Sequence, residues 1–596
     1  MVPDRLRKRR TSAAHAQEVR SRAISRRIFL GTATLALGTV CAAPLLSGRR
    51  RHDFTGSIVG GNYSLGHAFR DGKFPTISET AETGIVVVGG GISGLSAARR
   101  LHQKGVSDFT LLELESRPGG NAISGKNEIS EYPWGAHYVP IAGSDSTEVA
   151  ELFEDLGITA GRDAKGLSVY NEEYLCADPM ERLFLHGRWQ EGFVPQLGVA
   201  DADQRQMQAF FEEMRQFQSA RGRDSKRAFT IPLDASSRDE EFTRLDRITM
   251  AEYLREKGWL NCVPLRWYVN YCCRDDYGAG IESVSAWAGV HYFASRDGLA
   301  ANAPGYAVVT WPEGNGWFAR RLQAGISSKI RSSCAVWNVE IQNDSVLVDY
   351  FDAVRQKSVR LVAKGVVWAA PRFIAQRAIS LLRSQPATNP VYSPWMVANL
   401  TLNTMPAGPG MDLAWDNVLY DSRSLGYVVA THQNVHPVPR RTVLTYYQPL
   451  DAEEPAVARQ KALARSYEQW CELILADLRQ AHPDIADHLT NLDVWLWGHA
   501  MVRPVPGYIW GANRAQIQEP LGNIVFAHSD LSGIAIFEEA FTRGVRAADW
   551  LLARLQDSNQ AACNAARRDE FHESPLSKYG DSWNSSLRVR NPIPKV

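Results

Sequence analysis

The first regular pattern of apolar residues in the chain begins after Gly84. Residues 85–88 are a short run of Ile and Val that ends at a cluster of glycines. Residues 95–104 are predicted to form a helix, and residues 109–114 a second strand. Short continuous apolar runs are typical of strands that are buried on both faces of a parallel sheet. This order of elements predicts a βαβ unit.

Farther along, apolar and polar segments alternate, and no clean linker divides the chain into two halves. Residues 250–271 are predicted to form a helix, 274–278 a turn, and 283–293 an apolar, aromatic segment. The remaining predicted elements are strands at 345–350, 359–368 and 396–402 and a last helix at 537–555. A discontinuous two-domain α/β protein fits this alternation better than two successive domains.

Three polar stretches fall outside these elements. Residues 52–83 are rich in Gly and are expected to be a linker or an irregular N-terminal wrap. Residues 224–246 are predicted to be a surface excursion, and the chain beyond residue 557 a mobile polar tail.

The composition is that of a globular protein, because 44% of the 596 residues are hydrophobic and 22% are charged. This length allows more than one domain. The net charge of +1 is unevenly distributed, since residues 1–51 carry 12 Lys and Arg but only 2 Asp and Glu. The rest of the chain is therefore acidic, which argues against a nucleic-acid-binding surface.

The basic N-terminal region contains Ser25-Arg26-Arg27-Ile28-Phe29-Leu30, and an uncharged, largely apolar run follows to Leu46. This arrangement resembles a twin-arginine signal. The resemblance implies that the twin-arginine translocase exports the folded protein to the periplasm with a tightly held redox cofactor. A transmembrane helix or uncleaved anchor, and a lipoprotein modified at Cys41, are the alternatives.

The cysteines give no metal-binding spacing, and no metal site is predicted. Seven follow Cys41, an odd number, so at least one thiol should stay unpaired: Cys176, Cys262, Cys272, Cys273, Cys334, Cys471 and Cys563. The adjacent Cys272 and Cys273 are either a vicinal disulfide or two buried thiols of a core helix, and we favour the thiols.

The glycine cluster has the form Gly89-x-Gly91-x-x-Gly94, directly after a predicted strand and at the start of a predicted helix. In this context the motif predicts a dinucleotide site. Gly89 allows the tight turn, Gly91 the approach of a pyrophosphate, and Gly94 the close packing of helix on strand. Ile92 and Ser93 then present backbone N–H groups at the helix N-terminus. Glu113 would accept hydrogen bonds from the ribose, and Glu115 is the alternative.

The identity of the dinucleotide is suggested by the residues after the second strand. The segment from Leu112 to Asn121 has an acid followed by Arg117 and the pair Gly119-Gly120. It resembles the corresponding segment of flavin amine oxidases and carotenoid desaturases, which implies FAD rather than NAD. An Arg often follows the glycine pair in this family, whereas Asn121 stands there in this chain.

The resemblance to flavin amine oxidases continues in order through most of residues 84–556. Trp134-Gly135-Ala136-His137-Tyr138 resembles a family stretch that ends in Gly-Ala-His and an aromatic residue. Residues 335–339 resemble the segment whose Val contacts the adenine, which implies this role for Val336. Ala369-Ala370-Pro371 matches the turn that closes the sheet.

The C-terminal part of the resemblance begins at Asn523. Asp530 stands within a residue of the acid that usually binds the ribityl chain, although His528 replaces a usual Gly. The helix from Phe537 would direct its N-terminus towards the N1–C2 carbonyl side of the flavin.

The resemblance implies a discontinuous Rossmann-like FAD-binding domain of the GR2 type, interleaved with a mixed α+β substrate domain. The expected FAD-binding parts are residues 84–160, 305–380 and 501–556. The expected substrate-domain parts are 161–304 and 381–500. Residues 1–51, 52–83 and 557–596 remain as signal region, linker and tail.

Candidate residues for the reacting side are aromatic, because hydride transfer to a flavin requires a dry site and close approach. Trp134, Trp495, Trp497, Tyr508 and Trp510 are possible walls, although each fits a role in core packing equally well. His137 and His499 are candidate catalytic residues whose alternative is a structural histidine. Asp275 and Asp276 either attract a polyamine or cap a turn.

In amine oxidases a Lys on a strand faces flavin N5 and assists the reaction with oxygen. Alignment of that strand with residues 395–402 puts Asn399 at the position, and residues 391–405 contain no Lys or Arg. We therefore expect slow reaction with oxygen and a different electron acceptor, such as a membrane quinone or a periplasmic electron carrier. The alternative is that a Lys from elsewhere in the fold supplies the charge.

Together these features imply oxidation of an amine or polyamine by an enzyme that holds FAD non-covalently. The non-covalent link is expected because no Cys lies in residues 498–511, where monoamine oxidases attach their flavin. The alternatives are a desaturase or isomerase that acts on a lipid or isoprenoid, and a flavin-binding assembly protein without turnover. Fold alone does not decide among them.

Overall fold

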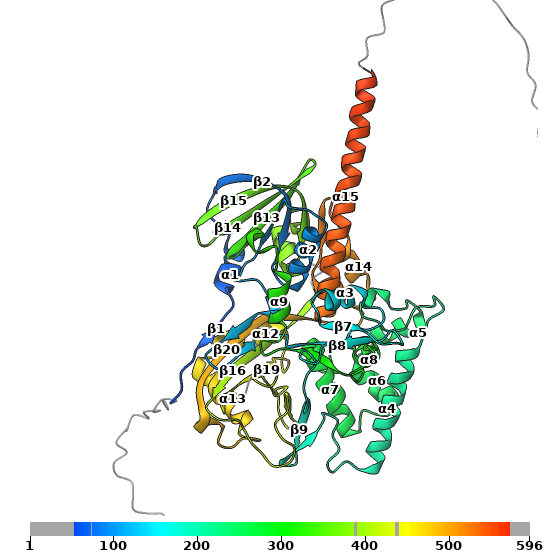
Figure 1. Ribbon diagram of the computed structural model, residues 1–596, viewed down its shortest axis with the longest axis vertical. Helices are drawn as coiled ribbons and strands as arrows, with labels where there is room; N and C mark the ends of the chain where they lie inside the picture. Colours follow the sequence, from blue (N-terminus) through cyan, green and yellow to red (C-terminus); the bar gives the residue numbers. More distant parts are fainter. Residues whose placement is uncertain (1–52, 73, 387–389, 435–439, 573–596) are drawn as a thin grey trace, which may run out of the picture. The chain divides into compact units, whose positions relative to one another are not determined.

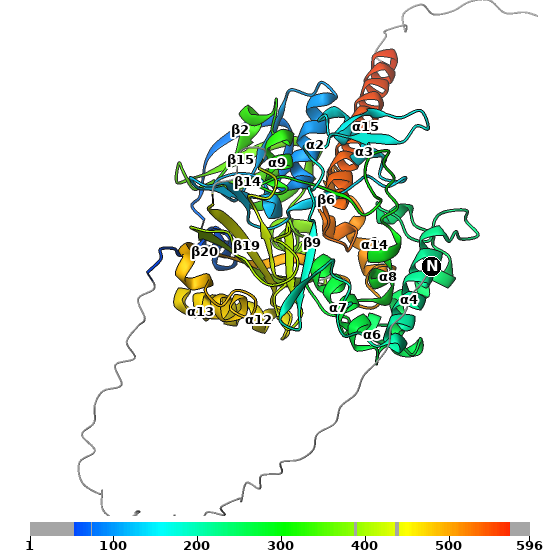
Figure 2. The same ribbon diagram turned by 60° about the horizontal axis from the view of Figure 1, so that its bottom comes forward.

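The computed structural model describes residues 53–72, 74–386, 390–434 and 440–572. The predicted signal, Cys41 and the tail beyond residue 572 lie outside this part of the chain. Figures 1 and 2 show the described part as two sheets with helices packed beside them.

One sheet has seven strands and contains the predicted βαβ unit (Figure 1). Its order is β12-β3-β2-β15-β14-β13, and β21 pairs with the end of β15. The strands are β2 (Ile77–Val88), β3 (Phe109–Leu112), β12 (Ile330–Arg331), β13 (Cys334–Gln342), β14 (Ser345–Asp352), β15 (Lys357–Trp368) and β21 (Ile524–Phe526). All pairs from β12 to β15 and from β15 to β21 are parallel, whereas β13, β14 and β15 are antiparallel. Three separate stretches of chain therefore build the parallel part.

Two helices, α2 (Ile92–Gln103) and α15 (Phe537–His572), lie side by side against this sheet (Figure 1). The inner face of α2 is apolar, with Leu95 and Leu101 fully buried. Gly544 of α15 is so close to α2 that a β-carbon there would lie 2.1 Å from the backbone oxygen of Ser93. This contact brings the C-terminal helix next to the helix that follows the glycine motif.

The second sheet has eight strands in the order β1-β20-β16-β19-β18-β17-β9-β10. They are β1 (Ile58–Val59), β9 (Glu181–Leu185), β10 (Arg188–Glu191), β16 (Val391–Leu402), β17 (Asp416–Leu419), β18 (Tyr427–Val429), β19 (Thr442–Pro449) and β20 (Leu489–Arg503). The helices beside it include α4 (Asp201–Ser219), α6 (Met250–Glu256), α7 (Val263–Tyr277), α8 (Ala286–Ala294), α12 (Pro455–Ala464) and α13 (Tyr467–Leu478). The predicted strands at 345–350, 359–368 and 396–402 are confirmed within β14, β15 and β16.

The expected linker at 52–83 is instead folded. It contains β1, helix α1 (Tyr63–Asp71) and the first part of β2. β1 pairs with β20 of the second sheet, and the backbone N–H of Asn62 donates to the Glu115 carboxylate at 2.8 Å. Such polar, Gly-rich segments are ordered here by contacts distant in sequence, which no local pattern reveals.

The helix predicted at 250–271 is also corrected, because two helices occupy this region. α6 ends at Glu256, Gly258 adopts a positive φ of 76°, and α7 continues to Tyr277. Asp275 and Asp276 therefore lie in the last turn of α7 rather than in a turn of their own, and Gly278 ends the helix in the left-handed conformation. The adjacent Cys272 and Cys273 are buried free thiols of α7.

Two further predictions differ from the structure. The segment 224–246 is not a surface excursion, because Phe229 and Leu233 are fully buried beneath its charged residues. The last helix extends to His572 rather than to 555, so the expected mobile tail is helical for its first part. Within the described residues, no helix is both long and apolar enough to span a membrane.

Candidate functional site

The glycine motif forms an open cradle at the end of β2. Gly89 has a φ of 101°, which favours glycine, and a β-carbon on Gly94 would lie 1.8 Å from the Gly89 oxygen. Gly91 differs, because its β-carbon would meet only the Cα of Gly120, at 3.8 Å. The pair Gly119-Gly120 thus faces the motif, and the Gly119 N–H donates to the Gly90 oxygen at 2.8 Å. No side chain fills the space in front of Gly91, so a ligand can approach the backbone there.

Glu113, at the end of β3, lies at one side of this cradle. Its carboxylate accepts from the backbone N–H groups of Gly90 at 2.5 Å and Glu115 at 2.8 Å. Burial raises the pKa of Glu113 to about 7 despite these bonds. Glu115 instead binds Asn62, so Glu113 remains the better placed acid for a ribose.

Asp530 lies at the opposite side, where β21 leads towards α15. It is buried and accepts from the backbone N–H of Arg372 at 2.8 Å and from the Tyr392 hydroxyl, while Nδ1 of His528 lies 2.9 Å away. Burial acts to raise the pKa of Asp530, but His528 and these donors outweigh it and lower the pKa below its ordinary value. Asp530 is therefore held as a carboxylate.

One cavity connects these groups, and we call it the cofactor groove. Of the predicted cofactor residues, it is lined by Gly89, Gly91, Ile92, Ser93, Glu113, Gly120, Asn121, Val336, Asp530 and Phe537, while Gly94 and Gly119 lie behind its surface. The groove runs from the βαβ unit to the first turn of α15, so both ends of the described chain contribute to it.

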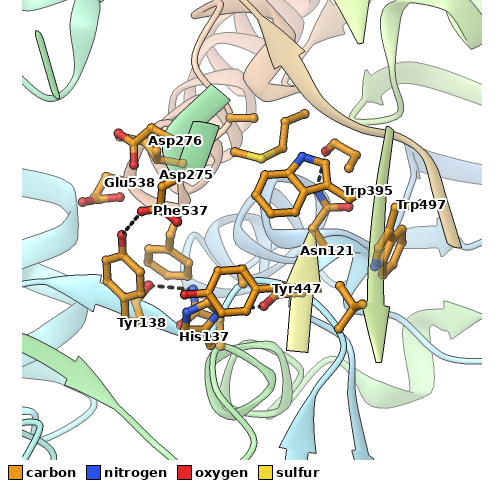
Figure 3. A pocket seen from close by; sticks show the side chains of 18 of the residues that line it. Asn121, His137, Tyr138, Asp275, Asp276, Trp395, Tyr447, Trp497, Phe537 and Glu538 are labelled. Carbon is orange, nitrogen blue, oxygen red and sulfur yellow. Dashed lines mark hydrogen bonds between the residues drawn. The ribbon is translucent and has the colours of Figure 1, made fainter. Parts of the chain in front are cut away.

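A second cavity, the substrate cavity, adjoins the groove (Figure 3). Its empty volume, including space open to solvent, is about 870 Å³. Asn121, Ala136, Asn315, Trp497, Ala500, Ala535, Ile536 and Phe537 line both cavities. A flat cofactor ring at this shared wall would face directly into the substrate cavity.

Aromatic side chains form much of the substrate cavity. Trp395, Trp497, Tyr138, Tyr447 and Phe537 line it, and Figure 3 shows the two indoles opposite the acidic side chains. The Trp497 ring is held because its Nε1 donates to the Trp134 oxygen at 2.7 Å. Such walls exclude water from a reacting centre.

Three carboxylates lie on the other side of the cavity. Asp276 makes a bidentate pair with Arg296, at 2.9 and 2.7 Å, and Asp275 accepts from the Tyr138 hydroxyl at 3.1 Å. Burial, and then the charge of Asp276, raise the pKa of Asp275 to about 7. Burial also raises the pKa of Glu538 to about 7. Arg296 is the only Lys or Arg among the described residues that line the two cavities, and its charge is paired.

His137 also lines the substrate cavity. Its Nδ1 lies 3.0 Å from the Gly135 oxygen, which fixes the proton on Nδ1, and its buried Nε2 has no partner. Burial lowers the pKa of His137 to about 4, so the ring is a neutral acceptor at Nε2.

The placement of Asn399 is a correction. Its side chain does not reach either cavity, because its Nδ2 donates to the Pro133 oxygen at 3.0 Å and its Oδ1 accepts from Thr445 at 2.6 Å. Two other residues of β16, Trp395 and Val397, line the substrate cavity instead. The error arose because a buried strand gives no sign of which residue reaches the cavity.

The other aromatic candidates also lie outside the substrate cavity. Trp134, Trp495, Tyr508 and Trp510 pack in the core and do not line it. His499 lines the cofactor groove and stacks on Phe373, with ring centroids 4.4 Å apart. Five residues that line the substrate cavity were not predicted as site residues: Asn315, Trp395, Tyr447, Arg296 and Glu538. Of these, Glu538 lies within the C-terminal motif, which is the signal that could have identified it.

The described residues contain no group of three or more His, Cys, Asp or Glu that could hold a metal ion. The groove fits FAD in two respects that the structure shows. The cradle at Gly91 leaves space for a pyrophosphate, and the buried amide oxygen of Asn315, on the wall of both cavities, has no partner within the protein. When bound, FAD would accept a hydride from a substrate in the adjoining cavity.

Comparison with known proteins agrees with this geometry. The profile of the NAD(P)-binding Rossmann-like domain family matches residues 87–156. A putrescine oxidase structure with bound putrescine aligns with a TM-score of 0.56 at 16% identity, over 80% of this chain and 100% of that one. Cyclohexylamine oxidase from Brevibacterium oxydans aligns with a TM-score of 0.55 at 17% identity, over the same shares. The chain has the flavin amine oxidase fold.

The relatives found by sequence include flavin-containing amine oxidases. Flavin-containing amine oxidase B from Cavia porcellus is 25% identical over 278 residues, which are 44% of this chain and 46% of that relative. The match thus spans about half the length of the curated relative. A fatty acid isomerase from P. acnes shares the fold as well, with a TM-score of 0.54 at 14% identity over 78% of this chain and 97% of that one.

Proposed function

We propose that this protein is an FAD-dependent oxidoreductase that oxidises an amine. The observation that carries the proposal is the polarity of the substrate cavity. The unpaired Nε2 of His137 is a hydrogen-bond acceptor, and Asp275 and Glu538 add carboxyl groups. A ligand that matches this cavity donates N–H groups and carries positive charge, as an amine does.

The aromatic walls support the same substrate class. The faces of Trp and Tyr rings attract cations, and they keep water away from the carbon that loses a hydride. Trp395, Trp497 and Tyr447 supply such faces. Asp275 orients the ammonium group through charge, because Arg296 pairs with Asp276 and leaves Asp275 outside that ion pair.

An outer recess supports entry of a cation. It shares Tyr138, Pro140, Asp275 and Arg296 with the substrate cavity, and its further acidic residues are Asp178, Glu181, Glu191, Asp297 and Asp416. Arg227, the other arginine that lines it, pairs with Asp297 at 2.7 Å. Burial raises the pKa of Glu181 to about 7 and that of Asp416 well above its ordinary value, so these two add little negative charge. The acidic residues still outnumber the arginines, which favours amines and polyamines along this route.

The alternatives make different demands on the cavity. An isomerase or desaturase of a lipid would bury an apolar chain, and the fold shared with a fatty acid isomerase keeps this candidate open. Burying such a chain against Asp275 and Glu538 is unfavourable. A flavin-binding assembly protein would need no such cavity beside the groove.

Anaerobic mixing of the holoprotein with primary amines, diamines, polyamines and a free fatty acid tests the proposal. Bleaching of the visible flavin band by an amine is expected, with no bleaching by the fatty acid. Asp275→Asn should raise KM for the reactive amine roughly 10- to 100-fold, which corresponds to the loss of one charged hydrogen bond. Asp178→Asn, in the outer recess only, is the matched control and should change KM much less. If no amine bleaches the flavin, the proposal is wrong.

We also propose that the protein is exported through the twin-arginine translocase and passes electrons to an acceptor other than oxygen. The support for export is the sequence Arg26-Arg27 and the apolar run after it. Replacing both arginines by Lys should leave the protein in the cytoplasmic fraction, whereas a Ser25→Ala control should still be exported. Equal export of the double variant would contradict this route.

A further inference from the structure

Asn315 has an unusual position for a residue that begins a helix. It is the N-cap of α9 (Gly316–Leu322), where an Asn side-chain oxygen normally accepts from a backbone N–H of the first turn. This side chain makes no such bond, although the residue is only 1% exposed. Its Oδ1 therefore accepts no hydrogen bond from the first turn of α9 and is buried without a donor within the protein.

The orientation of the amide is fixed by the segment opposite. The Asn315 backbone N–H donates to the Ala136 oxygen at 3.0 Å, and its Nδ2 donates to the Tyr138 oxygen at 3.0 Å. Because a carbonyl oxygen can only accept, Nδ2 must face Tyr138 and Oδ1 must face away from it. The side chain is held from two sides with its oxygen left free.

Asn315 lines both the cofactor groove and the substrate cavity. This inference rests on the proposed function, in which FAD occupies the groove and a substrate carbon approaches N5 from the substrate cavity. N5 must then lie where the two cavities meet. An acceptor on their common wall is close to that border.

The hydrogen-bonding character of N5 changes during the reaction. In oxidised flavin N5 is an acceptor without hydrogen. When the C–H bond of an amine breaks, both electrons and the hydrogen pass to N5, and the amine carbon becomes an iminium carbon. N5 then carries an N–H group, which is a donor. A fixed acceptor next to it disfavours the oxidised state and favours the reduced one.

We propose that Oδ1 of Asn315 accepts a hydrogen bond from the N5–H group of reduced FAD and thereby raises the reduction potential of the flavin. An unsatisfied buried acceptor is costly, which explains why the site needs a partner from the cofactor. The same contact positions the ring at the border of the two cavities. Asn315 is thus a redox-tuning residue of this chain.

Asn315→Leu tests the proposal, because leucine has a similar size and no acceptor. The ratio of reduced to oxidised flavin at a fixed potential should fall about tenfold, which is a shift of about 30 mV to more negative potential for a two-electron couple. The Kd of the apoprotein for oxidised FAD should change less than about threefold. Asn315→Ala carries the same expectations and gives the answer if the leucine variant does not fold.

Thr310→Val is the matched control. The Thr310 hydroxyl donates to the His137 oxygen at 2.7 Å. Thr310→Val removes this hydrogen bond and so weakens the attachment of residues 136–138, the segment that holds Asn315. Thr310 itself lines neither cavity. The potential of this variant should equal that of the wild type. An equal shift in Thr310→Val would show that only the position of the segment matters and would overturn the proposal.

Two other results would also overturn it. Weaker binding of oxidised FAD with an unchanged potential would assign Oδ1 to N3–H, which is present in both redox states. No change in either quantity would mean that Asn315 does not contact the flavin. Failure of the wild-type protein to bind FAD would instead refute the proposed function, so the two failures are distinguishable.

Discussion

Replacing Gly91 by leucine should weaken FAD binding roughly 100-fold or more while leaving the stability of the apoprotein nearly unchanged. The β-carbon at this position meets nothing closer than the Gly120 Cα, at 3.8 Å, and the backbone φ of −70° is open to any residue. The added side chain would occupy space in front of the cradle. Inserting several carbons into a packed site costs about 3 kcal/mol at the upper end of measured cases. This corresponds to a loss of roughly 100-fold or more in affinity for FAD.

Gly94→Ala is the matched comparison, because it should act on folding rather than on the ligand. Its β-carbon would lie 1.8 Å from the Gly89 oxygen and 2.9 Å from the Gly89 carbonyl carbon, both backbone atoms. Helix α2 must therefore move away from the turn. We expect the free energy of unfolding to fall by about 1–3 kcal/mol with or without FAD.

Urea unfolding of both apoproteins, followed by tryptophan fluorescence, measures the stability, and titration with FAD measures the affinity. Gly91→Leu should keep the wild-type urea midpoint and bind FAD more weakly, whereas Gly94→Ala should lower the midpoint. If Gly91→Leu binds FAD like the wild type, the assigned groove is wrong. If both variants lose the same free energy of unfolding, the assignment of Gly91 to ligand binding and of Gly94 to helix packing is wrong.

Three further predictions concern the bound flavin. The photoreduced enzyme should react slowly with oxygen, because no Lys lines either cavity in the described residues. In stopped-flow mixing with oxygen, Val397→Lys should accelerate reoxidation of the flavin by up to about 100-fold. Fast reoxidation of the wild-type enzyme would refute this prediction. Denaturation should release FAD into the supernatant, because residues 498–511 contain no Cys; flavin retained on the polypeptide would contradict the non-covalent assignment. Burial raises the pKa values of Asp275 and Glu538 to about 7, so both carboxyl groups gain negative charge as pH rises through 7. A permanently charged ligand such as benzyltrimethylammonium should then bind more tightly at pH 8 than at pH 6, by spectral titration of the flavin, and a flat profile would count against the role of these acids.

Local sequence determined the cofactor half of the protein. A strand, a turn that needs glycine and a helix are adjacent along the chain, so roles for Gly89, Gly91 and Gly94 could be predicted from their spacing together with the strand before them and the helix after them. The C-terminal motif was equally readable, since the Asp530 carboxylate and the start of α15 at Phe537 fall within a short segment. Backbone conformations of this kind depend on near neighbours.

The substrate half was decided by tertiary structure. Asn399 and Val397 are both buried residues of β16, and only packing against Pro133 and Thr445 directs Asn399 away from the substrate cavity. Arg296, in the loop after α8, reaches the cavity because it pairs with Asp276 of α7. These contacts join residues far apart in sequence, and their energies appear only when the chain has folded.

Asn315 illustrates the same division. The sequence shows a short polar residue before a helix, which predicts an ordinary cap. Only the folded protein brings the Tyr138 carbonyl to its amide nitrogen, leaves its oxygen buried without a cap partner and makes the residue part of the wall of both cavities. Its role follows from what surrounds it in space, because hydrogen bonding depends on distance and direction rather than on order along the chain.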